Sequence, residues 1–403
     1  MSTALQPLSQ TNRDTTLDLL RGFALAGVLL TFCITDVGAG ANYKSTLLDD
    51  IVNWPKFLLI ENRMYTTLII VFGIGFYVQL EKARQKNVSI NAPFTRRLMG
   101  LLLIGFAHAI ILSTRDVLMF YGIAGLFLLP MRNLSNRWLV AIIAIIFIVI
   151  IPLVSMVADG YQVFEFPKPN NYIDHLKHNW KVFTLYHQIY PIYFEMLFHF
   201  MLGFIIGRTG FLQRMTTDKI LRRKLLIGSL IGAAILIPGC FFWLPKLFRQ
   251  VVTGLPYMWQ KIALATGYRL IWQVCMIACV TLYSTSLISL WRTRRGKILL
   301  TPLAAFGQMT LSNYLIQSII LVPYLLLFDK YDNLPPFSGF ILFLITLGLQ
   351  LVFSSWWMAR YTMGPFEWLL RSFTYWKWQR IKKPAPNENA INTFLLSKTI
   401  NHL

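Results

Sequence analysis

Residues 17–36 read LDLLRGFALAGVLLTFCITD, and this stretch decides the class of fold. It is long enough to cross a bilayer as a helix, which takes about 20 mostly apolar residues because lipid offers no partners to backbone groups. It lacks the small-residue cleavage site of a signal peptide, so we expect a retained helix. The sequence therefore predicts an integral membrane protein.

The composition of the whole chain points to the same class. Of its 403 residues, 56% are hydrophobic and only 14% are charged, whereas a soluble protein carries about 25% charged residues. A net charge of +21, from 38 basic and 17 acidic residues, could indicate binding to nucleic acid. The basic residues instead flank apolar runs, as they do in cytoplasmic loops of membrane proteins. We therefore expect the lipid bilayer as a partner and no nucleic acid.

Further apolar runs follow the first one along the chain. Together they predict an all-α polytopic membrane protein with about ten transmembrane helices, in a single transmembrane domain covering residues 17–383. The candidate spans are residues 17–36, 64–80, 98–113, 117–131, 139–158, 190–206, 225–243, 262–290, 302–328 and 337–359.

Lysine and arginine gather in alternate connecting segments, which sets the orientation. They cluster in residues 81–97, 208–224 and 292–297 and after residue 360. By the positive-inside rule, these segments and both termini are cytoplasmic, and one missed helix would reverse the alternation beyond it. We expect residues 1–16 to be a cytoplasmic segment and residues 384–403 a weakly ordered cytoplasmic tail. The longest outer loop, residues 159–189, could cap an outward cavity.

Several patterns favour packing over chemistry. All four cysteines fall inside apolar runs, so neither a disulfide framework nor a metal site is predicted. Cys275 and Cys279 share a helix face, where packing is the expected role. FGIGF around Gly73 is typical of close helix contacts. No phosphate-binding glycine loop, paired-histidine metal motif or serine-hydrolase elbow is present.

Ionisable residues at membrane depth are costly, and they mark functional sites unless they serve as structural ion pairs. A first group falls in the outer halves of the predicted helices, and we expect it to form one outward-facing cavity that binds substrate. Buried ion pairing that fixes helix packing is the alternative for its charged members. The group comprises Glu61, Arg63, His108, Asp116, Glu195, His199 and Arg269, with the amides of Asn313 and Gln317 completing it.

His108 is the candidate general base of this group. It lies among apolar neighbours in GFAHAIIL. An imidazole, with an ordinary pKa of about 6.5, can accept and return a proton at neutral pH. A core histidine satisfied by hydrogen bonds is the alternative.

A second group lies at the cytoplasmic ends of the helices. Positive-inside anchoring and ion pairing would explain it. The functional alternative is a basic mouth that holds a phosphate-bearing donor such as a coenzyme A thioester, because arginine contacts phosphate in bidentate fashion. The group comprises Asp18, Arg21, Arg96, Arg97, Glu367 and Arg371, of which Arg21, Arg96 and Arg97 are the candidate donor ligands.

Several strings resemble the YeiB-like family of bacterial membrane proteins, catalogued as domain of unknown function 418. The resemblance covers nearly the whole chain before the tail, and the closing GPFEWLLRSFTY is its most specific part. The strings are LDLLRGFALAGVLL from Leu17, MYTTLIIVFGIGFYVQLEK from Met64, RRLMGLLLIGFAHAIIL from Arg96, RDVLMFYGIAGLFLLPMR from Arg115, FGQMTLSNYLIQS from Phe306 and SSWWMARYTMGPFEWLLRSFTY from Ser354.

That family is distantly similar to the transmembrane acyltransferase superfamily. The resemblance implies the inner membrane of a bacterium, no bound cofactor and an acyl coenzyme A as cosubstrate. In the superfamily an arginine of the first span is followed about eleven residues later by a functional histidine; Arg21 matches, but Phe32 occupies the histidine position. If this protein has kept acyltransferase activity without that histidine, His108 must be the base, with Asp116 or Glu195 orienting it.

Two other classes of function remain open. An outward cavity with Arg63, Glu195 and Arg269 would equally suit a transporter or exporter of a small solute. A non-catalytic partner in the assembly of envelope proteins is the third hypothesis. The substrate and the oligomeric state are not determined by the sequence.

Overall fold

Helices account for almost all the regular structure. The computed structural model describes residues 15–34, 44–85, 91–113, 116–151, 153–154, 169, 171–186, 191–252, 256, 260, 264–327 and 334–383. Across these residues the only non-helical pairing is an isolated bridge between Tyr361 and Lys382. The predicted terminal segment and tail lie outside the described residues, apart from the first residues of α1.

The described residues of the ten predicted spans lie mostly on helices. Within the described ranges, seven helices are long and apolar enough to cross a membrane, and an eighth is added if the bent pair α9 and α10 is one span. Two shorter apolar helices, α5 and α6 with its π-helical continuation, make up the remainder. The helical membrane fold is confirmed, while the count of ten and the cytoplasmic orientation stay predictions.

The helices that coincide with the predicted spans are α1 (Thr15–Cys33), α3 (Arg63–Gln85), α4 (Asn91–Ile111), α5 (Leu118–Met131), α6 (Asn136–Ile145), α9 (Pro191–Arg208), α11 (Lys219–Pro238), α14 (Arg269–Trp291), α16 (Thr310–Leu327) and α17 (Pro336–Arg360). The shorter helices are α2 (Leu47–Pro55), α8 (Tyr172–Tyr186), α10 (Phe211–Thr217), α12 (Leu244–Val252), α15 (Arg294–Gln308) and α18 (Pro365–Tyr375). The π-helical turns are η2 (Lys56–Ile60), η3 (Ile146–Ile150), η4 (Gly239–Trp243) and η5 (Leu264–Tyr268).

The predicted span at residues 302–328 is wrong as a single helix, because it breaks at Met309. The backbone of Met309 has φ −110° and ψ 36°, which separates α15 from α16. The side chain of Glu367 accepts the N–H groups of Leu311 and Ser312, and so satisfies donors that a new helix start leaves free. Hydropathy could not reveal this break because the apolar run continues through it.

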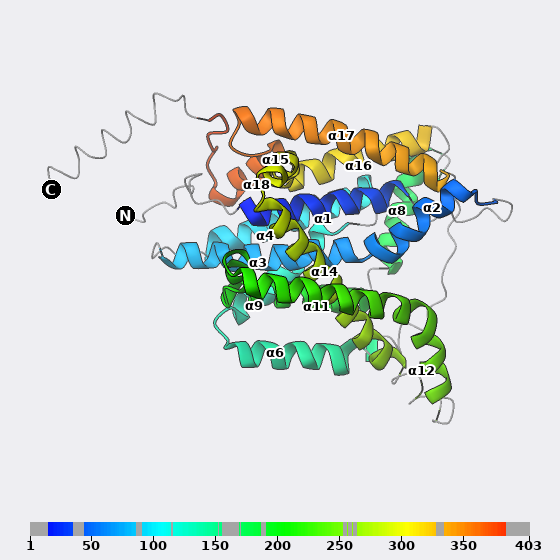
Figure 1. Cartoon of the computed structure of the whole chain (residues 1–403). Helices are drawn as coiled ribbons and strands as arrows, with labels where there is room; N and C mark the ends of the chain where they lie inside the picture. Colours follow the sequence, from blue (N-terminus) through cyan, green and yellow to red (C-terminus); the bar gives the residue numbers. More distant parts are fainter. Residues whose placement is uncertain are drawn as a thin grey trace.

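Helix α1 is the central helix of the bundle. In Figure 1 it runs between α16 and α17 on one side and α3 on the other. In the most apolar 18-residue stretch of α1, 67% of the residues are buried. The corresponding share is 28% for the span that contains α11 and 28% for α17. The latter two helices therefore present mostly apolar side chains outward, as expected of helices in contact with lipid.

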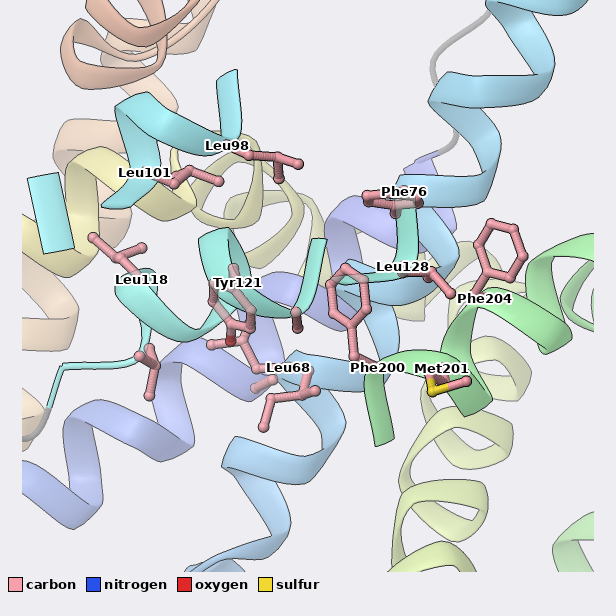
Figure 2. Packing of buried hydrophobic residues seen from close by; sticks show 14 of the residues in the cluster. Leu68, Phe76, Leu98, Leu101, Leu118, Tyr121, Leu128, Phe200, Met201 and Phe204 are labelled. Atoms are coloured by element: carbon pink, nitrogen blue, oxygen red, sulfur yellow. The ribbon is translucent and has the colours of Figure 1, made fainter. Parts of the chain in front are cut away.

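The main core forms where α3, α4, α5 and α9 meet (Figure 2). Glycines bring α3 and α9 into backbone contact: a Cβ added at Gly73 would lie 2.2 Å from the carbonyl oxygen of Phe200, and one at Gly203 would lie 2.2 Å from that of Ile70. Small residues at such crossings are the usual means of close helix packing in membranes. The predicted packing role of FGIGF is confirmed.

The two ends of the bundle differ in charge. Helices α15 and α18 lie at one end, where α1 begins and α17 ends, while α2, α8 and α12 lie at the other (Figure 1). At the first end Arg96, Arg208 and Arg292 donate to backbone carbonyls of neighbouring segments. We call it the basic end, and it is the end that the positive-inside rule predicts to be cytoplasmic.

Candidate functional site

His108 contacts an acid and an alcohol from two other parts of the chain. It lies in the last turn of α4. Its Nδ1 is 3.1 Å from Oδ1 of Asp116, and its Nε2 is 2.9 Å from Oγ of Ser318 in α16. All three residues are at most 5% exposed. We call Ser318, His108 and Asp116 the polar triad.

The start of α5 holds Asp116 in place. Its Oδ2 accepts the backbone N–H of Met119 at 2.7 Å, in the first turn of α5, where the helix dipole stabilises a carboxylate. Gly105 lets this turn approach α4, because a Cβ there would lie 2.4 Å from the Met119 nitrogen and 2.7 Å from Oδ2 of Asp116. A larger residue at position 105 would push the carboxylate away from His108.

The imidazole is placed to take a proton from the Ser318 hydroxyl while the Asp116 carboxylate stabilises it. Nδ1 of the ring and Oδ1 of Asp116 are 3.1 Å apart, although they are not aligned as a hydrogen bond. A carboxylate beside one ring nitrogen stabilises the imidazolium that forms when the other nitrogen takes a proton from a hydroxyl. The predicted role of His108 as a base therefore has a structural partner, Asp116.

Tyrosines surround the triad. Tyr314 lies one helical turn before Ser318, and its ring centre is 4.8 Å from that of His108. Asp116 interacts electrostatically with Tyr121 and Tyr193 as well as with Tyr314. The hydroxyl of Tyr121 is buried and makes no hydrogen bond with any described residue. It is a donor without a partner close to the triad.

A cavity of about 120 Å³ has Tyr65 in its lining. The lining also includes Glu195, His199, Trp272 and Gln273. Tyr65 also interacts electrostatically with Tyr121 and Tyr314, so it belongs to both environments. Nε2 of His199 and Oε1 of Gln273 are buried without a hydrogen-bond partner among the described residues. The cavity thus offers polar groups to a ligand.

The expectation of one outward cavity holding the whole first group is wrong. Glu195 and His199 line the cavity, and Arg269 pairs with Glu195. His108 and Asp116 form the separate triad, and Glu195 is paired with Arg269 instead of orienting His108. The ion-pair alternative is confirmed for Glu195 and Arg269.

Glu61 and Arg63 also lie apart from the cavity lining. The carboxylate of Glu61 pairs with Lys56 at 3.2 Å. Arg63 donates to the carbonyl oxygens of Phe57 and Glu61 at 3.3 and 3.1 Å, and its guanidinium lies over the Trp272 ring at 5.7 Å. These contacts fix the entry into α3 and leave no substrate role visible in the geometry.

The two amides of α16 do not line the cavity either. Asn313 donates to the Phe306 carbonyl and to Ser354 Oγ, at 3.0 and 2.9 Å. It therefore ties the break between α15 and α16 to α17. Gln317 is buried beside Ser318. Both amides therefore lie apart from the cavity that Glu195 and His199 line.

Ser318 is the member of the triad that sequence reasoning missed. Its pairing partner His108 lies 210 residues away along the chain. A serine one turn after a tyrosine in an apolar helix carries no motif, and such a hydroxyl ordinarily bonds to its own helix. Only the packing of α16 against α4 reveals the contact.

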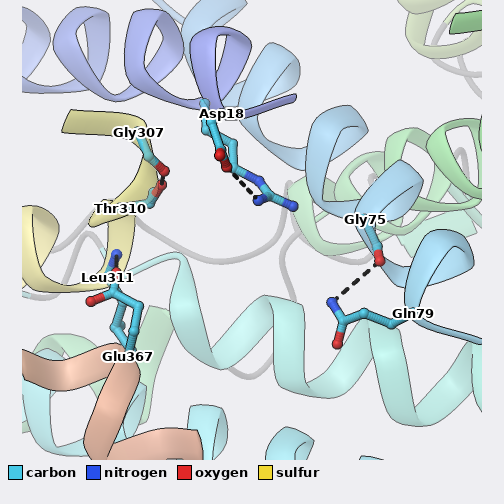
Figure 3. A network of polar contacts seen from close by, with 8 residues as sticks. Asp18, Gly75, Gln79, Gly307, Thr310, Leu311 and Glu367 are labelled. Atoms are coloured by element: carbon cyan, nitrogen blue, oxygen red, sulfur yellow. Dashed lines mark hydrogen bonds and ion pairs between the residues drawn. The ribbon is translucent and has the colours of Figure 1, made fainter. Parts of the chain in front are cut away.

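The basic end brings together part of the second group. Arg97 of α4 interacts electrostatically with Arg21 of α1 and Arg371 of α18, and with Glu367. Arg21 also pairs with Asp18 at 3.4 Å (Figure 3). We call Arg21, Arg97 and Arg371 the arginine cluster.

Arg96 is directed elsewhere. Its Nε donates to the Thr374 carbonyl at 2.8 Å, so it holds α18 against α4. Of the three predicted donor ligands, the structure therefore joins Arg21 and Arg97 and separates Arg96 from them.

Glu367 connects the arginine cluster to α16. It accepts the N–H group of Leu311 at 2.7 Å (Figure 3). It also accepts the N–H group of Ser312 at 3.2 Å and the Ser312 hydroxyl. Burial raises the pKa of Glu367, and the hydrogen bonds from Ser312 and Leu311 oppose that rise. Helix α4 thus carries a member of both polar arrangements, Arg97 of the arginine cluster and His108 of the triad, and Glu367 links the cluster to the start of α16.

Helix α8 caps α4 at the opposite end. Tyr172, His175 and Asn179 donate to the carbonyl oxygens of Ile111, Leu112 and Ile110, respectively, at 3.1, 2.8 and 3.0 Å. These are carbonyls that a helix end leaves without partners. Burial lowers the pKa of His175. The predicted outer loop therefore covers the end of α4 just beyond His108, as far as its described residues show.

Three of the four cysteines pack together in the bundle. Cys240, Cys275 and Cys279 are buried in one apolar cluster, which bears out the packing role predicted for the pair in α14. Within the described ranges, no group of three or more histidine, cysteine, aspartate or glutamate residues could hold a metal ion.

The fold and the triad define a class: a polytopic α-helical membrane protein with a buried histidine between a carboxylate and a hydroxyl. Residues 206–377 match the family described as "Protein of unknown function (DUF418)". The chain is 25% identical to "Uncharacterized protein YxaH" of Bacillus subtilis, over 94% of this chain and 98% of the relative. It is 24% identical to "Uncharacterized protein YeiB" of Escherichia coli, over 90% of this chain and 96% of the relative. These matches confirm the predicted resemblance to the YeiB-like family.

A further relative has the same extent of similarity. It is the "Uncharacterized 39.9 kDa protein in amylase 3'region" of Bacillus acidopullulyticus, 24% identical over 92% of this chain and 96% of the relative. The similarity to all three therefore covers the whole transmembrane bundle.

Proposed function

We propose that the protein is a membrane-embedded acyltransferase that moves an acyl group from a coenzyme A thioester to the hydroxyl of an envelope or small-molecule acceptor. The observation that carries the proposal is the contact of His108 with both Asp116 and Ser318. Acyl transfer to a hydroxyl needs a base that takes a proton and returns it to the leaving group. An imidazole stabilised by a carboxylate does this at neutral pH.

The arginine cluster supplies the donor site in this proposal. Guanidinium groups suit the phosphates of coenzyme A, and the cluster lies at the basic end, which we propose faces the cytoplasm of a bacterium. His108 follows Arg97 by eleven residues of α4, which is about 16 Å along a helix. The extended pantetheine arm of coenzyme A can span such a separation and bring the thioester to the triad.

Reconstituted protein tests the proposal. Purified chain in proteoliposomes would be given acetyl coenzyme A labelled in the acetyl group, and transfer of label to lipid or to added hydroxyl acceptors would be measured. His108→Ala should lower the transfer rate by about 10²- to 10⁴-fold. A rate that His108→Ala leaves unchanged would refute the proposal.

The arginine pair gives a matched control for donor binding. Arg97→Gln should raise the KM for the donor and abolish the thermal stabilisation that acetyl coenzyme A confers, because a ligand that binds only the folded state raises its stability. Arg96→Gln should leave both unchanged, since Arg96 bonds to the Thr374 carbonyl. Equal effects of the two substitutions would argue against a donor site at the arginine cluster.

Solute transport is the second candidate, and the cavity favours it. The unpartnered polar atoms of His199 and Gln273, beside the Glu195–Arg269 pair, suit a small polar solute. Uptake or export of solute by the proteoliposomes without transfer of label, lost in His199→Ala and retained in His108→Ala, would favour transport.

A further inference from the structure

We propose that Ser318 is the nucleophile of the reaction and carries the acyl group as a covalent ester before the acceptor receives it. The proposal rests on the acyltransferase function and goes beyond it, because a base alone would allow direct transfer between donor and acceptor. It assigns a catalytic residue that no motif of the sequence indicates.

The geometry of the triad supports a nucleophilic role. Ser318 Oγ lies 2.9 Å from His108 Nε2, while Nδ1 of the same ring faces Asp116 Oδ1 at 3.1 Å. The hydroxyl, the imidazole and the carboxylate thus follow one another in the order that activates a serine. Geometry and roles identify such a triad, whatever the order of its members in the chain.

The bond of Ser318 to its own helix is weak enough to yield. Its hydroxyl is 3.4 Å from the Tyr314 carbonyl, longer than its contact with His108. Hydroxyl hydrogen bonds are usually about 2.7 to 2.8 Å long. The hydroxyl proton can therefore be directed to the imidazole at little cost.

The reaction proceeds in two balanced halves. In the first, Ser318 Oγ attacks the thioester carbon, its proton passes to His108 Nε2, the carbon–sulfur bond breaks, and the thiolate leaves with that proton as free coenzyme A. In the second, the acceptor hydroxyl attacks the acyl-serine and gives its proton to His108. The ester bond to Oγ then breaks, and His108 returns the proton to Ser318.

A donor for the developing oxyanion is available nearby. The Tyr121 hydroxyl is buried and makes no hydrogen bond within the described part of the chain. It interacts electrostatically with Asp116 of the triad and with Tyr65, which lines the cavity. Hydrogen-bond donors at such a position stabilise the negative charge of a tetrahedral intermediate.

Two experiments on the purified full-length chain test the proposal. A fluorophosphonate probe, which modifies activated serines, should label the wild type at Ser318, as located by peptide mass spectrometry. Rapid acid quenching after addition of acetyl coenzyme A should trap an acetyl group on the same peptide. His108→Ala should slow probe labelling by about 10²-fold or more.

Ser229→Ala is the matched control for Ser318→Ala. Ser229 is also buried in a membrane helix and bonds a carbonyl of its own helix, that of Leu226 at 3.2 Å. Ser318→Ala should lose labelling and transfer while Ser229→Ala keeps both, and the melting temperature of each variant shows whether it folds. Labelling of a different serine, or an equal loss in both variants, would overturn the proposal.

The two proposals can fail separately. Transfer that persists in Ser318→Ala but is lost in His108→Ala would overturn the covalent intermediate and leave the acyltransferase standing. Labelling at Ser318 without transfer from any acyl coenzyme A would support the activated serine and overturn the proposed donor.

Discussion

Asp116 has two contacts that two substitutions can separate. One carboxylate oxygen faces His108 and the other accepts the Met119 N–H at 2.7 Å. Asp116→Asn keeps an oxygen for the N–H group but removes the charge that stabilises an imidazolium. Asp116→Ala removes both.

The structure sets the size of each effect. Loss of the carboxylate from an aspartate–histidine pair costs about 10⁴-fold in rate where the histidine acts as base, so both variants should transfer acyl groups about 10³- to 10⁴-fold more slowly. Asparagine and aspartate serve helix starts equally well, so Asp116→Asn should change the free energy of unfolding by less than about 1 kcal/mol. Asp116→Ala should cost about 1 to 2 kcal/mol, because the buried N–H of Met119 loses its acceptor.

Two measurements on each variant decide the matter. The transfer rate in proteoliposomes reports the charge, and denaturant unfolding in detergent reports the capping bond. An Asp116→Asn variant with the wild-type rate would refute the pairing of Asp116 with His108 in catalysis. An Asp116→Asn variant as unstable as Asp116→Ala would refute the assignment of the capping bond.

Three further expectations concern the fold. Gly203→Ala should lower the free energy of unfolding by about 1 to 3 kcal/mol by overpacking, whereas Gly228→Ala, with open space around it, should not; equal melting temperatures would contradict the close contact. Glu367→Ala should lower the free energy of unfolding by about 2 to 3 kcal/mol in denaturant, since three donors lose their acceptor. Glu367→Gln should lower it by less than half as much. A larger loss with glutamine would contradict the capping role of Glu367. Because burial lowers the pKa of His175 below 6.5, the unfolded chain binds more protons there, so stability is full above pH 6.5 and falls as the pH drops below it. The protection of α8 amides against hydrogen exchange, corrected for the intrinsic pH dependence of exchange, should fall at low pH in the wild type and not in His175→Gln. Equal protection in the two proteins would disprove the effect.

The membrane class and the positions of the helices were predictable because the bilayer imposes one strong requirement. Every spanning backbone must satisfy its own hydrogen bonds, so an apolar run of sufficient length becomes a helix whatever it packs against. The glycines around Gly73 were read correctly for a related reason, since small residues in apolar helices usually mark close crossings. The break at Met309 escaped detection because its cause, the side chain of Glu367, lies 58 positions further along the sequence.

The candidate site was predictable only in its members. Ionisable side chains are costly to bury in a membrane, and this cost singled out His108, Asp116, Glu195 and Arg269. The sequence alone could not assign the first two to the triad and the last two to the ion pair at the cavity. It also could not find Ser318, whose hydroxyl is inexpensive to bury and so carries no signal.

The sequence by itself determined that this protein is a helical membrane protein, where its helices run and which charged groups need partners, because hydropathy and charge act locally along the chain. Only the tertiary structure decided which partners those groups have. The end of α4, the start of α5 and the distant helix α16 meet around His108, and the close approach at Gly105 sets the carboxylate beside it. Contacts of that kind depend on packing between helices, which no local pattern encodes.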